Sequence, residues 1–306
     1  MIKHFIDLNQ IPATELKNIL SLAKKLKKEK NLDKQAKLLP HKNLAMIFEQ
    51  NSTRTRVSFE VGINQLGGHA IVMNKSDTQL NKGETIEDTA KVLSRFVDAI
   101  MIRSQLHQTI LDLAKYASVP VINALSDFSH PCQIMASILT IEEHLGKISG
   151  KKLAWFGDAN NVLNSYIHAA KIFDYELAIA TPKSFDFSNN EIKKAIKLGA
   201  KITYCEDPKK AAKDADVLIT DTWFSMTGNE KTDKSRKDKE KVLRPYQVNA
   251  SLMKLAKKNA IFSHCLPACR GFEVTAEVID SKQSIIFDEA ENRLHAQKAI
   301  LLWAMK

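Results

Sequence analysis

From about residue 44 onward the sequence alternates short apolar runs with amphipathic stretches, and this alternation constrains the fold more than any other feature. In the first half, the apolar runs of strand length are Leu44–Phe48, His69–Met73, Ala99–Ile102 and Pro120–Ala124. The stretches with helical periodicity between them are Arg56–Leu66, Thr85–Phe96 and Gln108–Ala117. Strands that alternate with helices in this way build a parallel sheet with crossover connections.

The same alternation restarts after Gly146–Gly150. The strands expected there are Lys152–Phe156, Glu176–Ala180, Lys201–Tyr204, Asp216–Ile219 and Ala260–His264. The helices expected there are Val162–Phe173, Asn190–Gly199 and Leu252–Lys257. A long helix over Pro131–Leu145 would connect the two halves, and the segment Asp288–Met305 predicts an amphipathic helix at the end. The sequence therefore predicts an α/β fold of two doubly wound domains, each with a central parallel sheet flanked by helices, joined by long interdomain helices.

The composition excludes several classes of protein. Of the 306 residues, 44% are hydrophobic, which is enough apolar material for two domain cores. No apolar run is long enough to span a bilayer, and the first residues lack the charged and apolar regions of a signal peptide. Four cysteines are too few for a disulfide framework and fit a reducing compartment. We therefore expect a cytoplasmic protein without a membrane partner.

The net charge of +10 has two interpretations. A basic surface can steer a phosphate-bearing substrate, or it can hold nucleic acid. Much of the excess lies in Lys24–Lys30 and Lys231–Lys241, which we interpret as solvated helix faces and a mobile loop. Few aromatic residues are interleaved as stacking platforms, so we expect no nucleic-acid partner.

The first motif that could bind a ligand or take part in a reaction is Ser52-Thr-Arg-Thr-Arg56, which lies between an expected strand and an expected helix. A helix N-terminus presents unpaired N–H groups and a partial positive charge, both of which suit a phosphate. Hydroxyl groups and the planar fork of Arg54 add donors in the same turn. The alternative is that Ser52 or Thr53 only caps the helix, which would not exclude binding.

The second motif is Ser129-His-Pro-Cys-Gln133, again between a strand and a helix. His130 and Gln133 lie one helical turn apart, so both can face one ligand, with His130 donating to a carbonyl oxygen. Arg103 ends the intervening strand, where open α/β sheets place ligand groups. The alternative for His130 is a histidine that only satisfies a loop carbonyl.

Two further motifs follow strands of the second half. His264-Cys-Leu-Pro-Ala-Cys269 raises the possibility of a metal site, but zinc needs three or four convergent ligands and no partner motif is visible. A cysteine nucleophile is weakly supported for want of a G-x-C-x-G elbow. Asp221 follows a strand and can hold an ammonium group, and Ser225-Met-Thr-Gly228 reads either as a hinged lid or as a structural turn.

Taken together, these segments resemble the aspartate and ornithine carbamoyltransferase family across nearly the whole chain. Ser52-Thr-Arg-Thr-Arg56 and His130-Pro-Cys-Gln133 resemble the carbamoyl-phosphate motifs of the whole family, whereas Asp221-x-x-x-Ser225-Met226 and His264-Cys-Leu-Pro267 resemble its ornithine branch. Glu84–Arg95, Gly157–Asn161 and Glu291–Arg293 also match. The resemblance implies carbamoyl transfer from carbamoyl phosphate to the δ-amine of ornithine, giving citrulline and phosphate, without metal or organic cofactor.

The resemblance also implies the roles of individual residues. The residues expected to bind carbamoyl phosphate are Ser52, Thr53, Arg54, Thr55, Gln79, Arg103, His130, Pro131, Cys132, Gln133, Cys265, Leu266 and Arg293. Of these, Arg54, Arg103, His130 and Cys265 would be catalytic. The residues expected to bind ornithine are Asn161, Asp221, Ser225 and Met226. Residues 1–146 with the C-terminal helix 288–306 would bind carbamoyl phosphate, and residues 147–287 would bind ornithine.

Gln79 stands where family members reach into a neighbouring site, so the resemblance implies a homotrimer, or a multiple of trimers, with shared active sites. The chain departs from the family pattern at Ala268-Cys-Arg-Gly-Phe272 and at Ser225-Met-Thr-Gly228. Both departures concern the acceptor, so putrescine, aspartate or an acylated ornithine stay open as alternatives. A non-catalytic phosphate- or nucleotide-binding protein is disfavoured, because neither a G-x-G-x-x-G nor a Walker A pattern is present.

Overall fold

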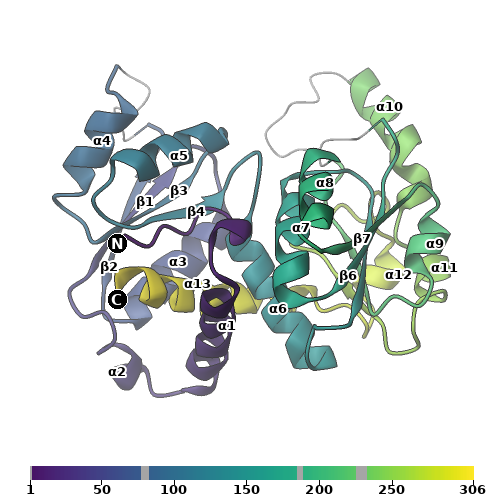
Figure 1. Ribbon diagram of the computed structural model, residues 1–306, viewed down its shortest axis with the longest axis horizontal. Helices are drawn as coiled ribbons and strands as arrows, with labels where there is room; N and C mark the ends of the chain where they lie inside the picture. The colour runs from purple at the N-terminus through teal and green to yellow at the C-terminus, as the bar shows by residue number, and fades with distance from the viewer. Residues whose placement is uncertain (1, 77–82, 185–188, 225–232) are drawn as a thin grey trace. The chain divides into compact units, whose positions relative to one another are not determined.

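The computed structural model describes residues 2–76, 83–184, 189–224 and 233–306, and it divides into two compact units. Unit 1 consists of residues 1–139 and 291–306, and unit 2 consists of residues 140–290 (Figure 1). Helices α6 (Pro131–Leu145) and α13 (Ile286–Met305) each have residues in both units.

Unit 1 is built on a four-stranded parallel sheet in the order β2-β1-β3-β4. The strands are β1 (Asn43–Phe48), β2 (His69–Asn74), β3 (Ala99–Arg103) and β4 (Val121–Leu125). The remaining helices are η1 (Leu8–Gln10), α1 (Ala13–Lys28), α2 (Leu32–Gln35), α3 (Thr53–Gln65), α4 (Ile86–Leu93) and α5 (His107–Tyr116). Helices α4 and α5 cover one face of the sheet, whereas α1, α3 and α13 cover the other (Figure 1).

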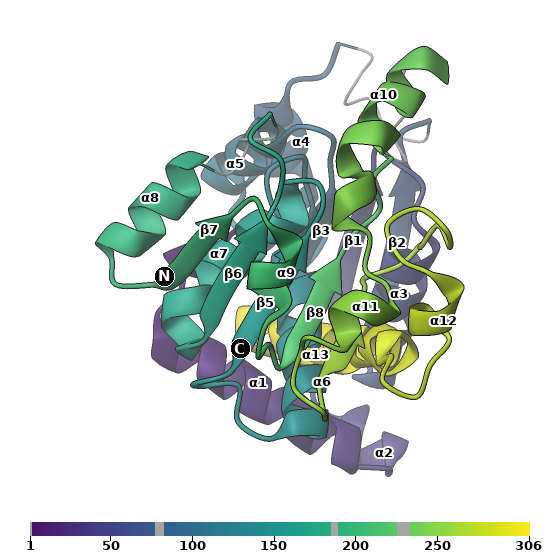
Figure 2. The same cartoon turned by 90° about the vertical axis from the view of Figure 1, so that its right-hand side faces the viewer.

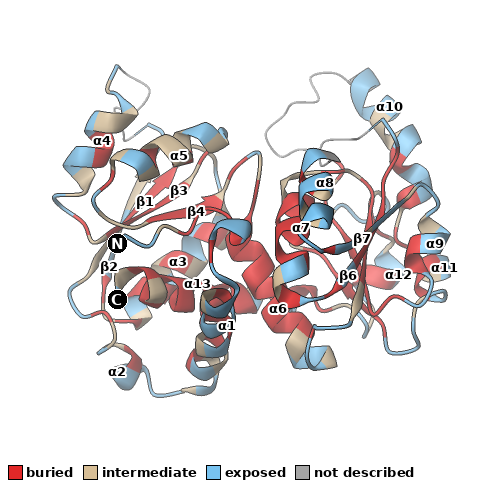
Figure 3. Ribbon diagram, viewed as in Figure 1, coloured by how far each residue is buried: buried red, intermediate tan, exposed pale blue. Residues whose placement is uncertain are grey.

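Both faces of this sheet are covered, so its central strands are apolar throughout rather than alternating. β1 and β3 are almost wholly buried (Figure 3). One core cluster joins Ile100 and Ile102 of β3 to Ile110 and Leu113 of α5. This packing makes the strand ends, where the polar motifs begin, rigid anchor points.

Unit 2 repeats the plan with a five-stranded parallel sheet in the order β7-β6-β5-β8-β9 (Figure 2). The strands are β5 (Lys152–Phe156), β6 (Glu176–Ala180), β7 (Lys201–Cys205), β8 (Val217–Thr220) and β9 (Ile261–Ser263). The helices are α7 (Asn161–Phe173), α8 (Asn189–Lys197), α9 (Pro208–Ala212), α10 (Asp233–Leu243), η2 (Arg244–Tyr246), α11 (Ala250–Met253) and α12 (Ala276–Ile279). Helices α7 and α8 lie on one face, and α9, α11 and α12 lie on the other (Figure 1).

The last helix returns to unit 1 and is held there by polar contacts that are buried or partly buried. Lys298 Nζ donates to Gln35 Oε1 at 2.6 Å and to Gln65 Oε1 at 2.8 Å. Trp303 Nε1 donates to Glu15 Oε2, and the Trp303 ring meets the Phe5 ring edge-on. The C-terminal residues are therefore part of the unit 1 core.

The predicted fold class is confirmed, because both sheets are parallel and both carry helices on two faces. Several predicted bounds shift by one to four residues: the helix expected at Arg56–Leu66 begins at Thr53, and the helix expected at Leu252–Lys257 is Ala250–Met253. Among the described residues, no helix is both long and apolar enough to cross a membrane.

One prediction about local structure was wrong. The lysine-rich segment expected as a mobile loop forms helix α10 over its described residues. Leu243 is buried against Trp223 and Phe224, the guanidinium of Arg236 lies 4.6 Å above the Phe224 ring, and Lys239 pairs with Asp158 at 2.8 Å. Composition alone suggested a solvated loop, whereas these tertiary contacts hold the segment as a helix.

Candidate active site

In unit 1 three predicted groups follow strands that are adjacent in the sheet. Ser52 follows β1, Arg103 ends β3 and His130 follows β4. Phe48 of β1 is in register with Arg103, and Arg103 is in register with Leu125 of β4. Because parallel strands end at the same edge of a sheet, these groups share one edge.

The first group is the turn that opens α3. Ser52 is the N-cap residue, and its Oγ accepts a hydrogen bond from Thr55 N at 3.3 Å. Thr53 is exposed and Arg54 is half-buried. The Nε of Arg54 is buried and has no hydrogen-bond partner among the residues that the structure describes. An unsatisfied buried guanidinium donor beside a helix N-terminus suits an anionic ligand.

Thr55 connects this turn to the C-terminal helix. Arg293 Nη2 donates to Thr55 Oγ1 at 2.7 Å, and both residues are almost fully buried. A hydroxyl that accepts from an arginine still has its own hydrogen to donate. The contact brings a residue of α13 to a turn that lies 238 positions earlier in the chain.

His130 lies close enough to three arginines of unit 1 to feel their charge. Its side chain is buried, and burial, followed by the positive charges of Arg293, Arg103 and Arg54, holds the pKa of His130 well below its ordinary value. The imidazole is therefore neutral at physiological pH. A neutral imidazole can donate one hydrogen bond to a carbonyl oxygen.

The residues after His130 begin α6. Pro131 is its first residue, and Gln133 is buried one turn from His130, with its N–H donating to the His130 carbonyl at 3.1 Å. The Sγ of Cys132 donates to the Asn123 carbonyl at 3.3 Å, and burial raises the pKa of Cys132 to about 12. Cys132 is thus a protonated thiol directed at the backbone of β4, so any contribution to ligand binding comes from its main chain.

A carboxylate that was not predicted from the sequence connects two of these strand ends. Glu49 Oε2 accepts from Ser104 Oγ at 2.6 Å and from Gln105 N at 3.0 Å, and Glu49 N donates to the Arg103 carbonyl at 3.0 Å. The position of Glu49 directly after β1 was the one available signal, and its partners lie 55 and 56 residues away.

Unit 2 carries a second cluster after β5, β8 and β9, which are also adjacent. Asp221 is largely buried; its Oδ2 accepts from Asn160 Nδ2 at 2.7 Å and its Oδ1 accepts from Cys265 Sγ at 3.2 Å. Asn160 also caps α7, accepting from the N–H groups of residues 162 and 163. The sequence predicted a site role for Asn161, the first residue of α7, and not for Asn160, although asparagine before a helix is a recognised cap signal.

A buried histidine organises the loop that follows β9. His264 Nδ1 accepts from Leu266 N at 2.9 Å, and His264 Nε2 lies 3.4 Å from Glu273 Oε1, with both side chains fully buried. The same carboxylate accepts from Cys269 N. Glu273 was missed, since nothing in its sequence neighbourhood distinguishes it from a surface acid.

The described residues contain one group of potential metal ligands, Asp221, His264 and Cys265. Their ligand atoms lie within 4.8 Å of one another. Nδ1 of His264 already accepts the Leu266 N–H, so Nε2 carries the ring proton and faces Glu273. The imidazole therefore has no lone pair directed at a metal, and the arrangement fits a loop-positioning histidine better than a ligand.

The departures from the family pattern also have structural partners. Arg270 forms a fork with Asp280, with Nη2 2.6 Å from Oδ1, and Cys269 is exposed. Phe272 meets Phe224 edge-on, with ring centroids 5.3 Å apart. Three predicted site residues, Gln79, Ser225 and Met226, lie outside the described residues.

Comparisons with known proteins cover the whole chain. The model of the carbamoyl-P binding domain of aspartate/ornithine carbamoyltransferases matches residues 3–143, and that of the Asp/Orn binding domain matches residues 149–304. An ornithine carbamoyltransferase of Brucella abortus (strain 2308) is 57% identical over 305 residues, which cover 100% of this chain and 96% of the relative. One from Methanospirillum hungatei is 51% identical over 302 residues, 99% of each chain.

Solved structures of similar proteins point to the same family. The ornithine carbamoyltransferase from Pyrococcus furiosus matches with a TM-score of 0.92 and 49% identity, over 99% of this chain and 97% of that one. An anabolic ornithine carbamoyltransferase from Campylobacter jejuni matches with a TM-score of 0.89 and 42% identity, over 98% of each chain. The chain therefore belongs to the aspartate/ornithine carbamoyltransferase family, in its ornithine carbamoyltransferase branch.

Proposed function

We propose that this chain transfers the carbamoyl group of carbamoyl phosphate to the δ-amine of L-ornithine, giving L-citrulline and phosphate, in arginine metabolism. The observation that carries this proposal is the cluster in unit 1, where the charges of three guanidinium groups act on one buried, neutral histidine and one of the three contacts the turn that opens α3. Such a site neutralises a phosphate and offers a hydrogen bond to an adjacent carbonyl. Membership of the ornithine branch supplies the acceptor.

On this proposal the donor binds in unit 1. Ser52, Thr53, Arg54 and Thr55 hold the phosphate, and Arg103 bridges phosphate and carbonyl. His130 and Gln133 orient the carbamoyl end, with Pro131 and Cys132 contributing the backbone of the same turn. Arg293 contacts the donor while it holds Thr55. Gln79 completes the site from a neighbouring subunit.

The acceptor binds in unit 2. Asp221 holds the ammonium of the amino-acid head, with Asn161, Ser225 and Met226 around it. Cys265 and the main chain of Leu266 lie beside the reacting amine and contact the carbamoyl group. The contact from Cys265 Sγ to Asp221 and the bond from Leu266 N to His264 support a fixed geometry for these two residues.

The reaction follows from these positions. Donor phosphate charge is neutralised by Arg54, Arg103 and the N-terminus of α3. The neutral δ-amine attacks the carbamoyl carbon and forms the new N–C bond, and the charge that develops on the carbonyl oxygen is held by Arg103, His130 and the Thr55 hydroxyl. The C–O bond to phosphate then breaks, and the departing phosphate takes the proton of the amine. Positioning of two bound substrates supplies much of the rate gain.

The activity is tested by measuring citrulline formed from carbamoyl phosphate with a panel of acceptors: ornithine, putrescine, aspartate and N-acetylornithine. We expect turnover with ornithine and at least 100-fold lower kcat/KM with the others, because Asp221 provides a partner for an α-ammonium. A preference for putrescine or N-acetylornithine would assign the departures in residues 268–272 to a changed acceptor. Phosphate binding without turnover of any acceptor would refute the proposal that this chain is a carbamoyltransferase.

We propose further that the enzyme is a homotrimer, or a multiple of trimers, that works in the cytoplasm. None of the four cysteines, all of which the structure describes, forms a disulfide, which fits a reducing compartment. The trimer rests on the resemblance at Gln79, and light scattering after size exclusion measures the mass of the oligomer.

Mixing Arg54→Ala with Gln79→Ala subunits, each inactive alone, should restore part of the activity if sites are shared. A monomer with full activity would contradict this.

A further inference from the structure

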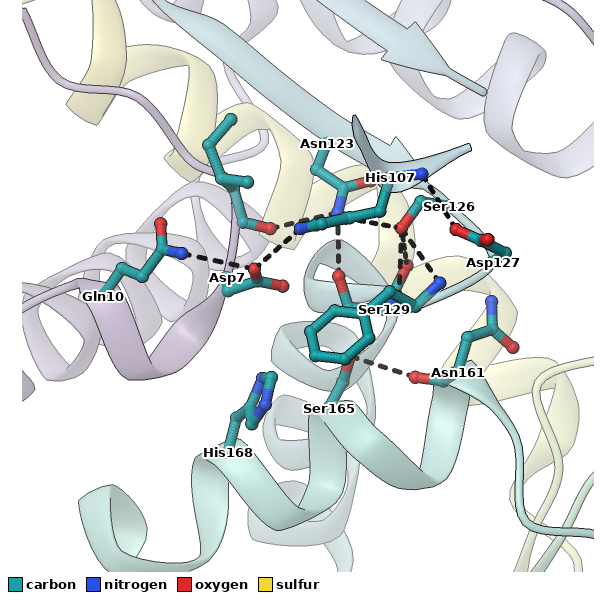
Figure 4. A network of polar contacts seen from close by, with 12 residues as sticks. Asp7, Gln10, His107, Asn123, Ser126, Asp127, Ser129, Asn161, Ser165 and His168 are labelled. Carbon is teal, nitrogen blue, oxygen red and sulfur yellow. Dashed lines mark hydrogen bonds and ion pairs between the residues drawn. The ribbon is translucent and has the colours of Figure 1, made fainter. Parts of the chain in front are cut away.

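His107, the first residue of α5, bridges the N-terminal segment of unit 1 to the turn that leads to His130 (Figure 4). Its Nε2 lies 3.2 Å from Asp7 Oδ2, and its Nδ1 lies 2.8 Å from Ser126 Oγ. The side chains of Asp7 and His107 are 3% and 14% exposed, so this contact is shielded from water. Gln10 Nε2 also donates to Asp7 Oδ2, at 3.4 Å.

Ser126 is the centre of that turn. Its Oγ accepts from Ser129 N at 3.1 Å and from Phe128 N at 3.3 Å, and its own N–H donates to the Ser129 carbonyl at 2.9 Å. His130 is the next residue along the chain. The orientation of the Ser126 hydroxyl therefore fixes the backbone immediately before His130.

Three further hydrogen bonds tie the turn and its neighbours together (Figure 4). Asn123 Nδ2 donates to Ser129 Oγ at 2.9 Å and to the Ile6 carbonyl at 3.0 Å. His107 N donates to Asp127 Oδ1 at 2.8 Å. The turn is thus held by β4, by the start of α5 and by residues 6 and 7.

The order Asp-His-Ser invites comparison with a hydrolase triad, but the geometry opposes it. Ser126 is fully buried, and its oxygen already accepts two backbone N–H groups. A nucleophile must reach a substrate, whereas this hydroxyl is enclosed by its own turn and by His107. The network has a conformational role instead.

We propose that His107, oriented by Asp7, is a positioning residue that aims His130 at the carbamoyl oxygen through the turn at residues 126–129. This inference rests on the proposed function. Asp7 accepts the proton of Nε2, so Nδ1 accepts the Ser126 O–H, which leaves the Ser126 oxygen available to the two N–H groups. Histidine suits the position because it donates on one side and accepts on the other.

The consequence for catalysis is specific. A hydrogen bond to the carbamoyl oxygen strengthens as charge develops there, so a misdirected His130 costs more in the transition state than in the ground state. His107→Ala should therefore lower kcat by about 10- to 100-fold. The KM for ornithine and the inhibition constant of inorganic phosphate should stay within two-fold, because neither Asp221 nor Arg54 contacts the network. His107→Gln, which can keep one of the two bonds, should lose less.

A double-mutant cycle separates positioning from a general loss of structure. If His107 acts through His130, then His107→Ala should lower kcat little in a His130→Ala background, by less than two-fold. Multiplicative effects of the two substitutions would overturn the proposal. Where His107→Ala fails to fold, Asp7→Asn, which keeps the shape of the side chain, serves in the same cycle.

The matched control is His168→Ala. His168 is a buried histidine of α7 whose Nε2 lies 3.0 Å from the Glu191 carboxylate. The substitution therefore removes a comparable histidine–carboxylate contact in unit 2. We expect kcat within two-fold of wild type after folding is verified by circular dichroism. An equal loss in His168→Ala and His107→Ala would also overturn the proposal. Absence of citrulline with the wild-type chain would instead refute the proposed function.

Discussion

The two candidate half-sites use opposite charges and different kinds of support. In unit 1, Arg54, Arg103 and Arg293 surround a neutral His130, and the groups come from strand ends, a helix start and the C-terminal helix. In unit 2 the central group is the carboxylate of Asp221, held by an amide and a thiol from neighbouring strand ends. One half-site complements an anion and the other complements a cation.

On the proposed function, this difference means that the donor and the acceptor are bound by groups of opposite charge. Guanidinium groups keep their charge across the physiological pH range, so unit 1 offers an anion a positive charge that does not change with pH. The cluster of unit 2 offers the largely buried carboxylate of Asp221, whose two oxygens are oriented by fixed donors. The charged groups of the two half-sites lie on separate units, so each can be substituted separately.

The largest effect should come from unit 1. Arg54→Ala removes a half-buried guanidinium from the phosphate position, and we expect kcat/KM for carbamoyl phosphate to fall by about 10²–10³-fold. The control is Arg56→Ala, two positions along the same helix, where the side chain is exposed and pairs with Glu60 at 3.5 Å. That variant should stay within two-fold. Steady-state kinetics on both variants, with thermal denaturation to verify folding, decide the matter.

The second effect isolates unit 2. Asp221→Asn keeps the shape of the side chain and removes its charge, so we expect kcat/KM for ornithine to fall by roughly 100-fold while inhibition by inorganic phosphate is unchanged. The control is Asp214→Asn, an exposed position with φ of 56°, which asparagine tolerates well. If Asp221→Asn weakened phosphate inhibition as much as ornithine turnover, the half-sites would not be separate.

More candidate site residues were derived from local sequence patterns in unit 1 than in unit 2, because the signals in unit 1 lie within short stretches of sequence. The cap at Ser52, the arginine beside it and the turn before α6 are each contained in a few residues that follow an apolar strand. Periodicity and capping preferences therefore locate them. The exception is Arg293, whose bond to Thr55 spans 238 positions and was reached through family resemblance alone.

The groups that sequence missed are those whose role depends on distant partners. Asn160 differs from Asn161 because its amide reaches Asp221, and Glu273 differs from other acids because the chain folds it against His264. His107 and Asp7 lie 100 positions apart, and neither belongs to a motif. Short-range signals give the elements and their ends, whereas the pairing of buried polar groups is a property of the assembled core.

The comparison also predicts a dependence of stability on pH that is specific to unit 1. The pKa of His130 is lowered by burial and by the arginines, so the unfolded chain binds its proton near pH 6.5 and the folded chain does not. Above pH 6.5, His130 is neutral in both states and does not lower the free energy of unfolding. Below pH 6.5 the unfolded chain takes up a proton that the folded chain does not, so the free energy of unfolding falls by at most about 1.4 kcal/mol per pH unit.

His130→Gln removes this titration. The difference in Tm, wild type minus variant, should consequently be larger at pH 7.5 than at pH 5.5. His69→Gln, which changes an exposed side chain at the start of β2, is the control and should show no such trend. A difference that grows on acidification would mean that His130 is charged in the folded protein, and the neutral-donor role would fail.

The smallest effect concerns the helix that the sequence misassigned. Lys239 of α10 pairs with Asp158 at 2.8 Å, and both side chains are less than one-fifth exposed, at 18% and 17%. Asp158 lies in the loop that leads from β5 to Asn160, so the pair links α10 to the acceptor half-site. Partial burial makes the pair stronger than a surface salt bridge, yet the two ends remain within reach of solvent. We expect Lys239→Ala to cost about 1 kcal/mol of stability and to raise the KM for ornithine about two- to three-fold.

Lys237→Ala, at an exposed position of the same helix, should change neither quantity. Because the pair is electrostatic, the difference between the two variants should shrink in 1 M salt, where the Debye length is about 3 Å. A salt-independent difference would indicate that the aliphatic part of Lys239, rather than its charge, supports the loop.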